Sequence, residues 1–190
     1  MILCGLKTYA LVEEWQSTLP LKSQFLISDD LKDRVDFWVK IYAKYTSKQG
    51  VFHLVDNPAK VFGSIDLSSI YDNPKLSNAE KKKILMEKVS NKKLFYAVKN
   101  NIDIKKIRLQ MGLKDRTKTA FFHSGKYLEE IENIFKAEGL PVELTRLAYV
   151  ESSFNLKAKS KVGASGIWQI MPNVGRSNGY ITKNYDKRNH

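Results

Sequence analysis

The stretch "LPVELTRLAYVESSFNLKAKSKVGASGIWQIMP", residues 140–172, joins a short apolar helical repeat to a loop of small residues. Leu144, Leu147 and Ala148 recur at helical spacing, and Glu151 falls on the same stripe. Packing of the stripe would desolvate the carboxyl group of Glu151 and raise its pKa, as a general acid requires. The alternative, which periodicity alone favours, is a carboxylate at a helix end that faces solvent or pairs with a lysine.

The residues that follow favour a catalytic or ligand-binding role for this segment. The run from Gly163 to Gly166 allows two backbones, or a backbone and a ligand, to approach closely. The side chain of Gln169 can donate and accept hydrogen bonds, as a sugar hydroxyl or acetamido group requires. Trp168 and Met171 offer apolar faces to a sugar ring, although each could equally fill a core. Each signal is weak when it is taken separately.

Together, the order and spacing of these residues are specific. The chain carries Glu-Ser-x-aromatic-Asn at 151–155 and Gly-Ala-x-Gly-hydrophobic-x-Gln-hydrophobic-Met-Pro at 163–172. This pattern resembles the catalytic-domain signature of family 1 lytic transglycosylases, the SLT type with a goose-lysozyme-like fold. Trp168, Gly175-Arg176 and the upstream "GKYLEEIENIFKAEGLP" are similar to the membrane-bound murein transglycosylase D subgroup. The resemblance extends from about residue 100 to residue 190.

The resemblance implies a definite reaction. Its substrate is the peptidoglycan glycan strand, cut at the β-1,4 bond between N-acetylmuramic acid and N-acetylglucosamine to give 1,6-anhydromuramic ends. Glu151 corresponds to the single general acid/base, because the acetamido group of the substrate assists at the anomeric carbon. Ser160, Gln169 and Met171 correspond to residues that line the sugar sites, and Ser152 to a positional serine. No cofactor and no metal is implied.

The sequence also departs from the family pattern. Leu156 stands where the family often has proline, and "NYDKRNH" at the end resembles part of an Asp-x-Arg-x-Asp-Pro segment. Because the later helices of the family are absent, we expect a C-terminally truncated domain. Its cleft would lack one wall, which would leave Glu151 wetter and lower its pKa.

The charge balance widens the range of possible functions. The chain of 190 residues has 32 basic and 20 acidic residues, a net charge of +12. This surface favours polyanions such as nucleic acid, anionic lipid or acidic wall polymer, but the lysines are dispersed, which argues against a nucleic-acid footprint. Three hypotheses follow: a lytic transglycosylase, a non-catalytic wall-binding or interaction protein derived from one, and a basic nucleic-acid-binding protein with an accidental motif.

The N-terminus and the small number of cysteines and histidines limit the possible disulfides, metal sites and cellular locations. Cys4 is the only cysteine and the three histidines are far apart, so neither a disulfide nor a metal site is expected. "ILCG" faintly resembles the end of a lipoprotein signal, but an ordinary cysteine is the favoured interpretation. The substrate implies the periplasm or cell envelope, with possible peripheral membrane or lipoprotein association. No complete export signal is visible, so we expect an upstream start or another route. The oligomeric state is not predicted.

The fold prediction is mainly α: an incomplete lysozyme-like domain at 101–190, preceded by a helical region at 1–100 with one short β-hairpin. Residues 29–48 are predicted to form a helix, and 51–67 two strands around an Asp-Asn-Pro turn. Ser77 and Glu80 are spaced as a capping box for the next helix. Its predicted buried face consists of Ile84, Leu85, Val89, Leu94 and Val98.

Shorter helices are expected in the second half of the chain. Asp103 is predicted to cap a helix through Met111, and "RTKTAFFHSG" to add another turn or two. Ser124 is predicted to cap a helix that Gly139 ends. Pro141 suits the first turn of the helix that leads to Glu151.

Overall fold

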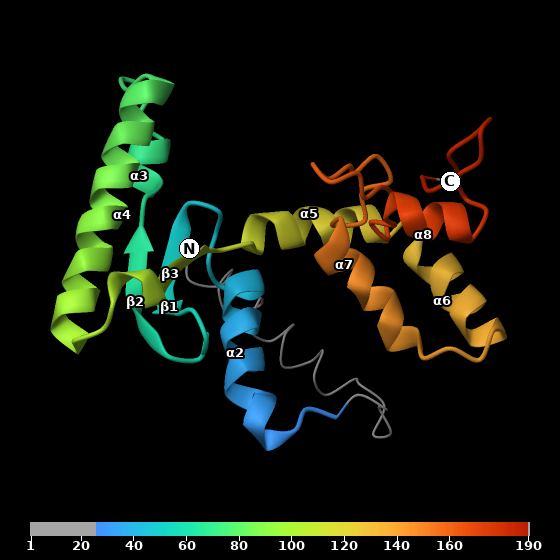
Figure 1. Ribbon diagram of the computed structural model, residues 1–190, viewed down its shortest axis with the longest axis horizontal. Helices are drawn as coiled ribbons and strands as arrows, with labels where there is room; N and C mark the ends of the chain where they lie inside the picture. Colours follow the sequence, from blue (N-terminus) through green and yellow to red (C-terminus); the bar gives the residue numbers. More distant parts are fainter. Residues whose placement is uncertain (1–25, 190) are drawn as a thin grey trace. The chain divides into compact units, whose positions relative to one another are not determined.

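The computed structural model describes residues 26–189, so the interpretations of Cys4, of the first 15 residues and of His190 lie outside the described residues. The chain divides into two units, Met1–Asp115 and Arg116–His190 (Figure 1). The sequence suggested a boundary between residues 100 and 101. The structural boundary lies later, because residues 107–111 form a strand of the first unit.

The first unit is built on a three-stranded antiparallel sheet in the order β2-β1-β3. Its strands are β1 (Gln49–Leu54), β2 (Val61–Asp66) and β3 (Ile107–Met111). The hairpin prediction is therefore confirmed, whereas the helix predicted from Asp103 to Met111 is wrong beyond its first turn. Asp103 does cap a 3-10 turn, η1 (Ile104–Lys106), through the backbone N–H of Lys105. Strand β3 follows because its apolar residues alternate with Arg108 and Gln110 and pair with β1.

Two helices flank the hairpin, with α3 (Ser68–Tyr71) leading into the long helix α4 (Asn78–Asn100) (Figure 1). The capping box is confirmed: the backbone N–H of Ser77 donates to the carboxylate of Glu80 at 2.8 Å, and the N–H of Glu80 donates back to Ser77 Oγ at 3.3 Å. The buried face is partly wrong, since Leu85 and Val89 pack on the core but Ile84, Leu94 and Val98 are exposed. The core is formed by Phe52, Ile65, Leu67, Ile70, Tyr96, Ala97 and Ile107.

Helix α2 (Asp29–Ala43) packs on the residues of β1 that point away from α4, because successive side chains of a strand alternate between faces. Phe37 and Ile41 form a small cluster there with Val51. The helix prediction is confirmed, but the helix ends at Ala43 rather than at residue 48, and Ser28 is its N-cap residue.

The second unit consists of short helices and long loops: all but the first two residues of α5 (Lys114–Ser124), then α6 (Leu128–Ala137), η2 (Val142–Arg146), α7 (Leu147–Glu151) and α8 (Pro172–Ser177). Ser124 does not cap α6 as predicted. It ends α5, where its hydroxyl donates to the carbonyl of Phe121 at 2.9 Å, and Tyr127 precedes α6. Gly139 adopts the expected left-handed conformation, with φ of 68°. The mainly helical fold class is confirmed, and the core of this unit is centred on Ala148, Phe154 and Ile167.

Candidate functional site

Glu151 is the last residue of α7, and its side chain is exposed. Ala148 is fully buried, but Leu147 is 52% exposed. The predicted stripe is interrupted because residues 142–146 form a 3-10 helix, whose side chains repeat every three residues rather than every 3.6. The expectation of a desolvated carboxylate is therefore wrong for this structure, and Glu151 meets solvent at the helix end.

The backbone turns sharply after Glu151. Ser153 and Phe154 both have φ of 56°, a left-handed conformation that is unusual for residues with a side chain and costs roughly 1–3 kcal/mol each. The strain is offset by the burial of Phe154, whose ring contacts Tyr149 edge-on at 4.6 Å between centroids. The turn thus fixes the path of the chain that leaves the carboxylate.

Ser152 joins the two sequence motifs. Its hydroxyl donates to the carbonyl of Ile167 at 2.8 Å and accepts a hydrogen bond from the backbone N–H of Asn155 at 3.2 Å. The residue after Glu151 is therefore fixed to the small-residue segment, an arrangement compatible with the positional role predicted for this serine.

Ser160 lies where that loop closes. Its Oγ accepts a hydrogen bond from the backbone N–H of Ala164 at 2.9 Å, and its own N–H donates to the carbonyl of Ala164 at 2.9 Å. Further along, the backbones of Ser165 and Ile170 exchange hydrogen bonds of 3.2 and 3.0 Å. The segment from residue 160 to residue 170 is thus a closed, hydrogen-bonded loop.

Gln169 lies in this loop with φ of 47°, a further left-handed residue. Its side-chain nitrogen donates to the carbonyl oxygens of Gly166, at 2.9 Å, and Ala158, at 3.3 Å. Met171 is 38% exposed and precedes α8, whereas Trp168 is half-buried and stacks on Phe135 of α6 with 5.9 Å between ring centroids. Trp168 therefore packs against the core of this unit, whereas Met171 is partly exposed to solvent.

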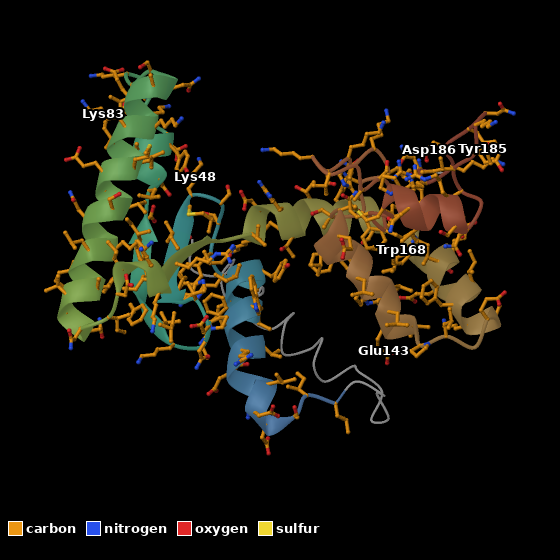
Figure 2. The ribbon with its side chains drawn as sticks, in the orientation of Figure 1. Lys48, Lys83, Glu143, Trp168, Tyr185 and Asp186 are labelled. Carbon is orange, nitrogen blue, oxygen red and sulfur yellow. The ribbon has the colours of Figure 1, made fainter. Side chains whose placement is uncertain are left out.

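Asp186 and Arg188 were not predicted as site residues, yet they fasten the loop (Figure 2 labels Asp186). Arg188 Nη1 donates to the carbonyls of Gly163, at 2.7 Å, and Ile170, at 2.8 Å. Its Nε and Nη2 donate to the two carboxylate oxygens of Asp186 at 2.9 and 2.7 Å. These hydrogen bonds lower the pKa of Asp186 to about 2. The Asp-x-Arg spacing in "NYDKRNH" was the only sequence signal for this contact.

The structure brings the predicted residues into one region of the second unit. Ser152, Ser160 and Gln169 are tied into the loop framework that follows Glu151, and Met171 lies at its exit. An exposed carboxyl group can donate and accept a proton, and Glu151 is joined to this loop through the hydrogen bond from the adjacent Ser152 to the carbonyl of Ile167. Within residues 26–189, no group of three or more His, Cys, Asp or Glu side chains is arranged to hold a metal ion.

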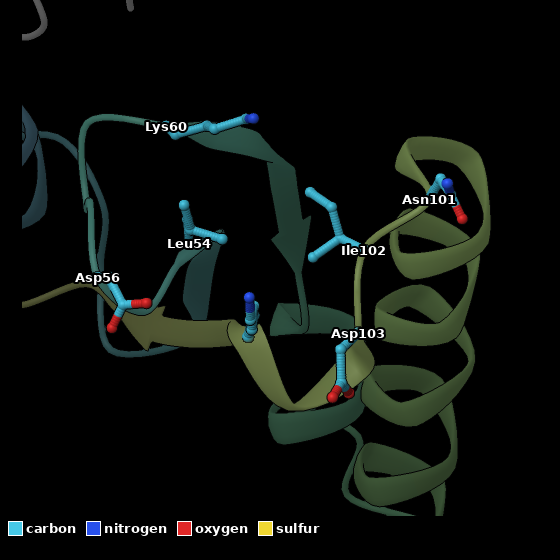
Figure 3. A pocket seen from close by; sticks show the side chains of 7 residues that line it. Leu54, Asp56, Lys60, Asn101, Ile102 and Asp103 are labelled. Carbon is cyan, nitrogen blue, oxygen red and sulfur yellow. The ribbon is translucent and has the colours of Figure 1, made fainter.

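A separate cavity of about 290 Å³ lies in the first unit (Figure 3). Aspartate and lysine side chains surround two apolar ones, so the cavity presents both signs of charge. Sequence patterns did not predict it, because its lining comes from two stretches that are far apart along the chain, residues 54–60 and 101–106. The lining residues are Leu54, Asp56, Lys60, Asn101, Ile102, Asp103 and Lys106.

Comparisons with known proteins find similarity in the last third of the chain. The family model of the transglycosylase SLT domain matches residues 130–190. Two curated relatives, the membrane-bound lytic murein transglycosylase D proteins of Escherichia coli K12 and of E. coli O6:H1 strain CFT073, are each 44% identical over 63 residues. The matched segment is 33% of this chain and spans only 14% of either relative. No solved structure matches.

Among the described helices, from α2 to α8, none combines the length and the apolar character needed to cross a membrane. The matched segment contains Glu151, both motifs and the Asp186–Arg188 pair. Residues 130–190 are therefore similar in sequence to the transglycosylase SLT domain family.

Proposed function

We propose that this chain belongs to a peptidoglycan lytic transglycosylase in which Glu151 is the sole general acid/base. The observation that carries the proposal is that Glu151 begins the first motif within the segment similar to the SLT domain. Glu151 is exposed, and the hydroxyl of the next residue, Ser152, donates to the carbonyl of Ile167 in the small-residue segment. The chain spans a small part of the relatives, so their names support this activity without extending it to the whole protein.

The reaction runs in two steps. The carboxylic acid of Glu151 protonates the oxygen of the β-1,4 bond, and the bond between that oxygen and the anomeric carbon of N-acetylmuramic acid breaks. The carbonyl oxygen of the acetamido group of the same sugar bonds to the anomeric carbon as the leaving oxygen departs, so a second protein carboxylate is not needed, unlike in most glycosidases. The carboxylate of Glu151 then takes the proton of the O6 hydroxyl as O6 bonds to the anomeric carbon and the bond from the acetamido oxygen breaks. No water is consumed.

The loop residues would bind and orient the sugars. Met171 offers an exposed apolar side chain to a sugar ring, and the loop that carries Ser160 and Gln169 supplies polar groups for hydroxyl and acetamido groups. Because the amide nitrogen of Gln169 donates within the loop, we expect its oxygen to be the atom that accepts from substrate.

A second candidate is a non-catalytic wall-binding or interaction protein derived from such an enzyme. The exposure of Glu151 favours it, since an acid that must be protonated near neutral pH gains from desolvation. The substrate itself, once bound, is the group that could exclude water in the enzymatic case. In either case we place the protein in the cell envelope, where peptidoglycan lies.

The two candidates differ in the products formed from purified sacculi. We expect the wild-type chain to release muropeptides with anhydro ends, Glu151→Gln to release none above background, and Glu130→Gln to match the wild type. Glu130 is a suitable control because it is an exposed glutamate of α6 in the same unit. Mass spectrometry of the soluble fraction is the readout. Sacculus binding without release by all three proteins would favour the non-catalytic candidate.

A further inference from the structure

Helix α4 presents apolar side chains to solvent along its C-terminal half. Leu94 is 54% exposed, Phe95 52% and Val98 74%. The three lie within little more than one turn, while the neighbouring Tyr96 and Ala97 pack on the sheet. We refer to Leu94, Phe95 and Val98 as the Phe95 face. Leu94 and Val98 were predicted to lie in the core, so their exposure needs an explanation of its own.

Lysines frame the Phe95 face. The ammonium group of Lys92 lies 5.5 Å from the centroid of the Phe95 ring, and that of Lys99 lies 5.8 Å from it. Residues 88–102 contain four lysines and no aspartate or glutamate. Figure 2 shows the side chains of this helix projecting on the side away from the sheet. The surface is therefore apolar at its centre and positive at its edges.

We propose that the Phe95 face docks on the surface of an anionic lipid bilayer. The three apolar side chains would enter the boundary between headgroups and acyl chains, as in other interfacial amphipathic helices. The lysines would contact lipid phosphates, because their long stems let the charged ends reach the headgroups while the methylenes cover the apolar ring. The helix would lie along the surface, with the sheet on its other side.

A bilayer fits this surface better than other occupants do. A nucleic acid or an acidic polymer would engage the lysines but would leave Leu94 and Val98 without an apolar partner. A second copy of the chain would bury the apolar residues but would bring its lysines against those of the first copy, which is unfavourable. An anionic bilayer satisfies both the apolar and the charged groups. The inference involves only the first unit and stands whether or not Glu151 is catalytic.

The test is sedimentation of the full chain with vesicles of phosphatidylglycerol and phosphatidylcholine, and with vesicles of phosphatidylcholine alone. We expect binding to the anionic vesicles only, weakening as salt is added. The double variant Phe95→Ser/Val98→Ser should bind roughly tenfold or more weakly. Lys92→Gln and Lys99→Gln should each reduce binding about fivefold.

Matched control variants distinguish binding through the Phe95 face from non-specific binding by exposed apolar or basic residues. Phe122→Ser removes another exposed phenylalanine, 84% exposed and outside α4, and Lys32→Gln removes an exposed lysine of α2. Both should bind as the wild type does. All variants should unfold at the wild-type temperature, because the altered residues are at least half exposed or lie at the surface.

Several outcomes would overturn the proposal. Equal binding to neutral and anionic vesicles would remove the role of charge. Unchanged vesicle binding by the Phe95→Ser/Val98→Ser variant would show that another part of the chain binds. A Phe95-dependent dimer in sedimentation velocity without lipid would identify a second copy as the occupant, and tight DNA binding that the same double variant loses would identify nucleic acid.

Discussion

The two units of this chain are stabilised in different ways. In the first unit, side chains of β1 alternate between two helices, and Phe52 and Val51 are buried on opposite faces of one strand. In the second unit, the segment around residues 151–170 is held by hydrogen bonds to backbone carbonyls, many from Arg188, Gln169 and Ser152. Burial of apolar side chains determines the structure of the first unit, and hydrogen bonds to backbone carbonyls determine the loop structure of the second unit.

Backbone strain follows the same division. Among the described residues, four residues other than glycine have positive φ, and three of them, Ser153, Phe154 and Gln169, flank the candidate site. Strained backbone persists only where the surrounding structure over-determines it, and it tends to cluster at functional sites. The second unit therefore holds one loop conformation at a cost in stability, as a binding loop would.

The largest expected effect tests apolar burial in the first unit. Phe52 is fully buried, and its ring lies 5.3 Å from that of Tyr96. Phe52→Ala should lower the free energy of unfolding by about 3–5 kcal/mol, because it removes a large buried ring and leaves a cavity. Val61→Ala is the control, since Val61 is 49% exposed, and should cost less than about 1 kcal/mol. Urea unfolding followed by circular dichroism gives both values, and similar values for the two variants would contradict the account.

The next effect concerns the fastened loop. Gly166 has φ of 80°, and a Cβ there would lie 2.0 Å from the carbonyl oxygen of Arg188. Gly166→Ala should destabilise the second unit by about 3 kcal/mol, from backbone strain and overpacking together. Gly139→Ala isolates the strain, because Gly139 has φ of 68° and nothing lies within 4 Å of the added atom. That variant should cost about 1 kcal/mol. Equal losses in thermal unfolding would show that the contact with Arg188 is unimportant.

A smaller, local effect is expected from Arg188→Lys. A lysine keeps the charge but cannot reach the two carbonyls and Asp186 at once, as the guanidinium fork does. Amide exchange at Ser165 and Ile170, whose backbones are paired, should accelerate while exchange in β1 stays unchanged. Arg176→Lys, at an exposed arginine of α8, is the control. Wild-type exchange rates in Arg188→Lys would mean that the loop is held by other contacts.

The smallest expected effect is a difference between the two units in how their stability depends on pH. His53 is 4% exposed, its Nδ1 lies 2.9 Å from the carbonyl oxygen of Leu54, and its Nε2 has no partner. Burial lowers the pKa of His53 below 6.5, helped by the charge of Arg108. Above about pH 6.5 the histidine is neutral in both folded and unfolded states, so its full contribution is present. Below that pH the unfolded state binds a proton more readily than the folded state does. The free energy of unfolding therefore decreases as the pH is lowered from about 6.5 through the pKa of His53 in the folded state.

His53→Leu should remove this acid dependence between about pH 7 and pH 5 in urea unfolding of the first unit. Asp186 should act at lower pH, because hydrogen bonds from Arg188 lower its pKa from 3.8 to about 2. Its contribution is present above about 3.8 and is lost as pH falls through about 2. Parallel loss of structure in both units near pH 6 would contradict this separation.

Sequence patterns predicted the features that depend on near neighbours. The Ser77–Glu80 capping box, the hairpin and the left-handed Gly139 follow from groups a few residues apart. Strand β3 was missed because its pairing with β1 is more than 50 residues distant along the chain, and propensity alone suggested a helix. The outward face of α4 was mispredicted because its apolar residues occupy more than one side of the helix.

The candidate site was predicted in part. Glu151, Ser152, Ser160, Gln169 and Met171 were found from motif order, and their roles toward substrate remain predictions. The exposure of Glu151 was one of two alternatives that the sequence left open, and the 3-10 helix before α7 decides between them because it changes which side chains share a face. The role of Arg188 depends on contacts with residues 18 and 25 positions away, and local patterns do not register such contacts.

Whether O6 of the sugar or water attacks the anomeric carbon can be read directly from the fate of solvent oxygen during cleavage. Sacculi digested in water enriched in heavy oxygen should yield muropeptides with anhydro ends that carry no label, since O6 of the sugar attacks in place of water. The same digestion with Glu151→Gln should yield no such products. Labelled reducing ends in the wild-type digest would identify a hydrolase, and unlabelled anhydro ends at the wild-type level from Glu151→Gln would show that Glu151 is not the acid/base.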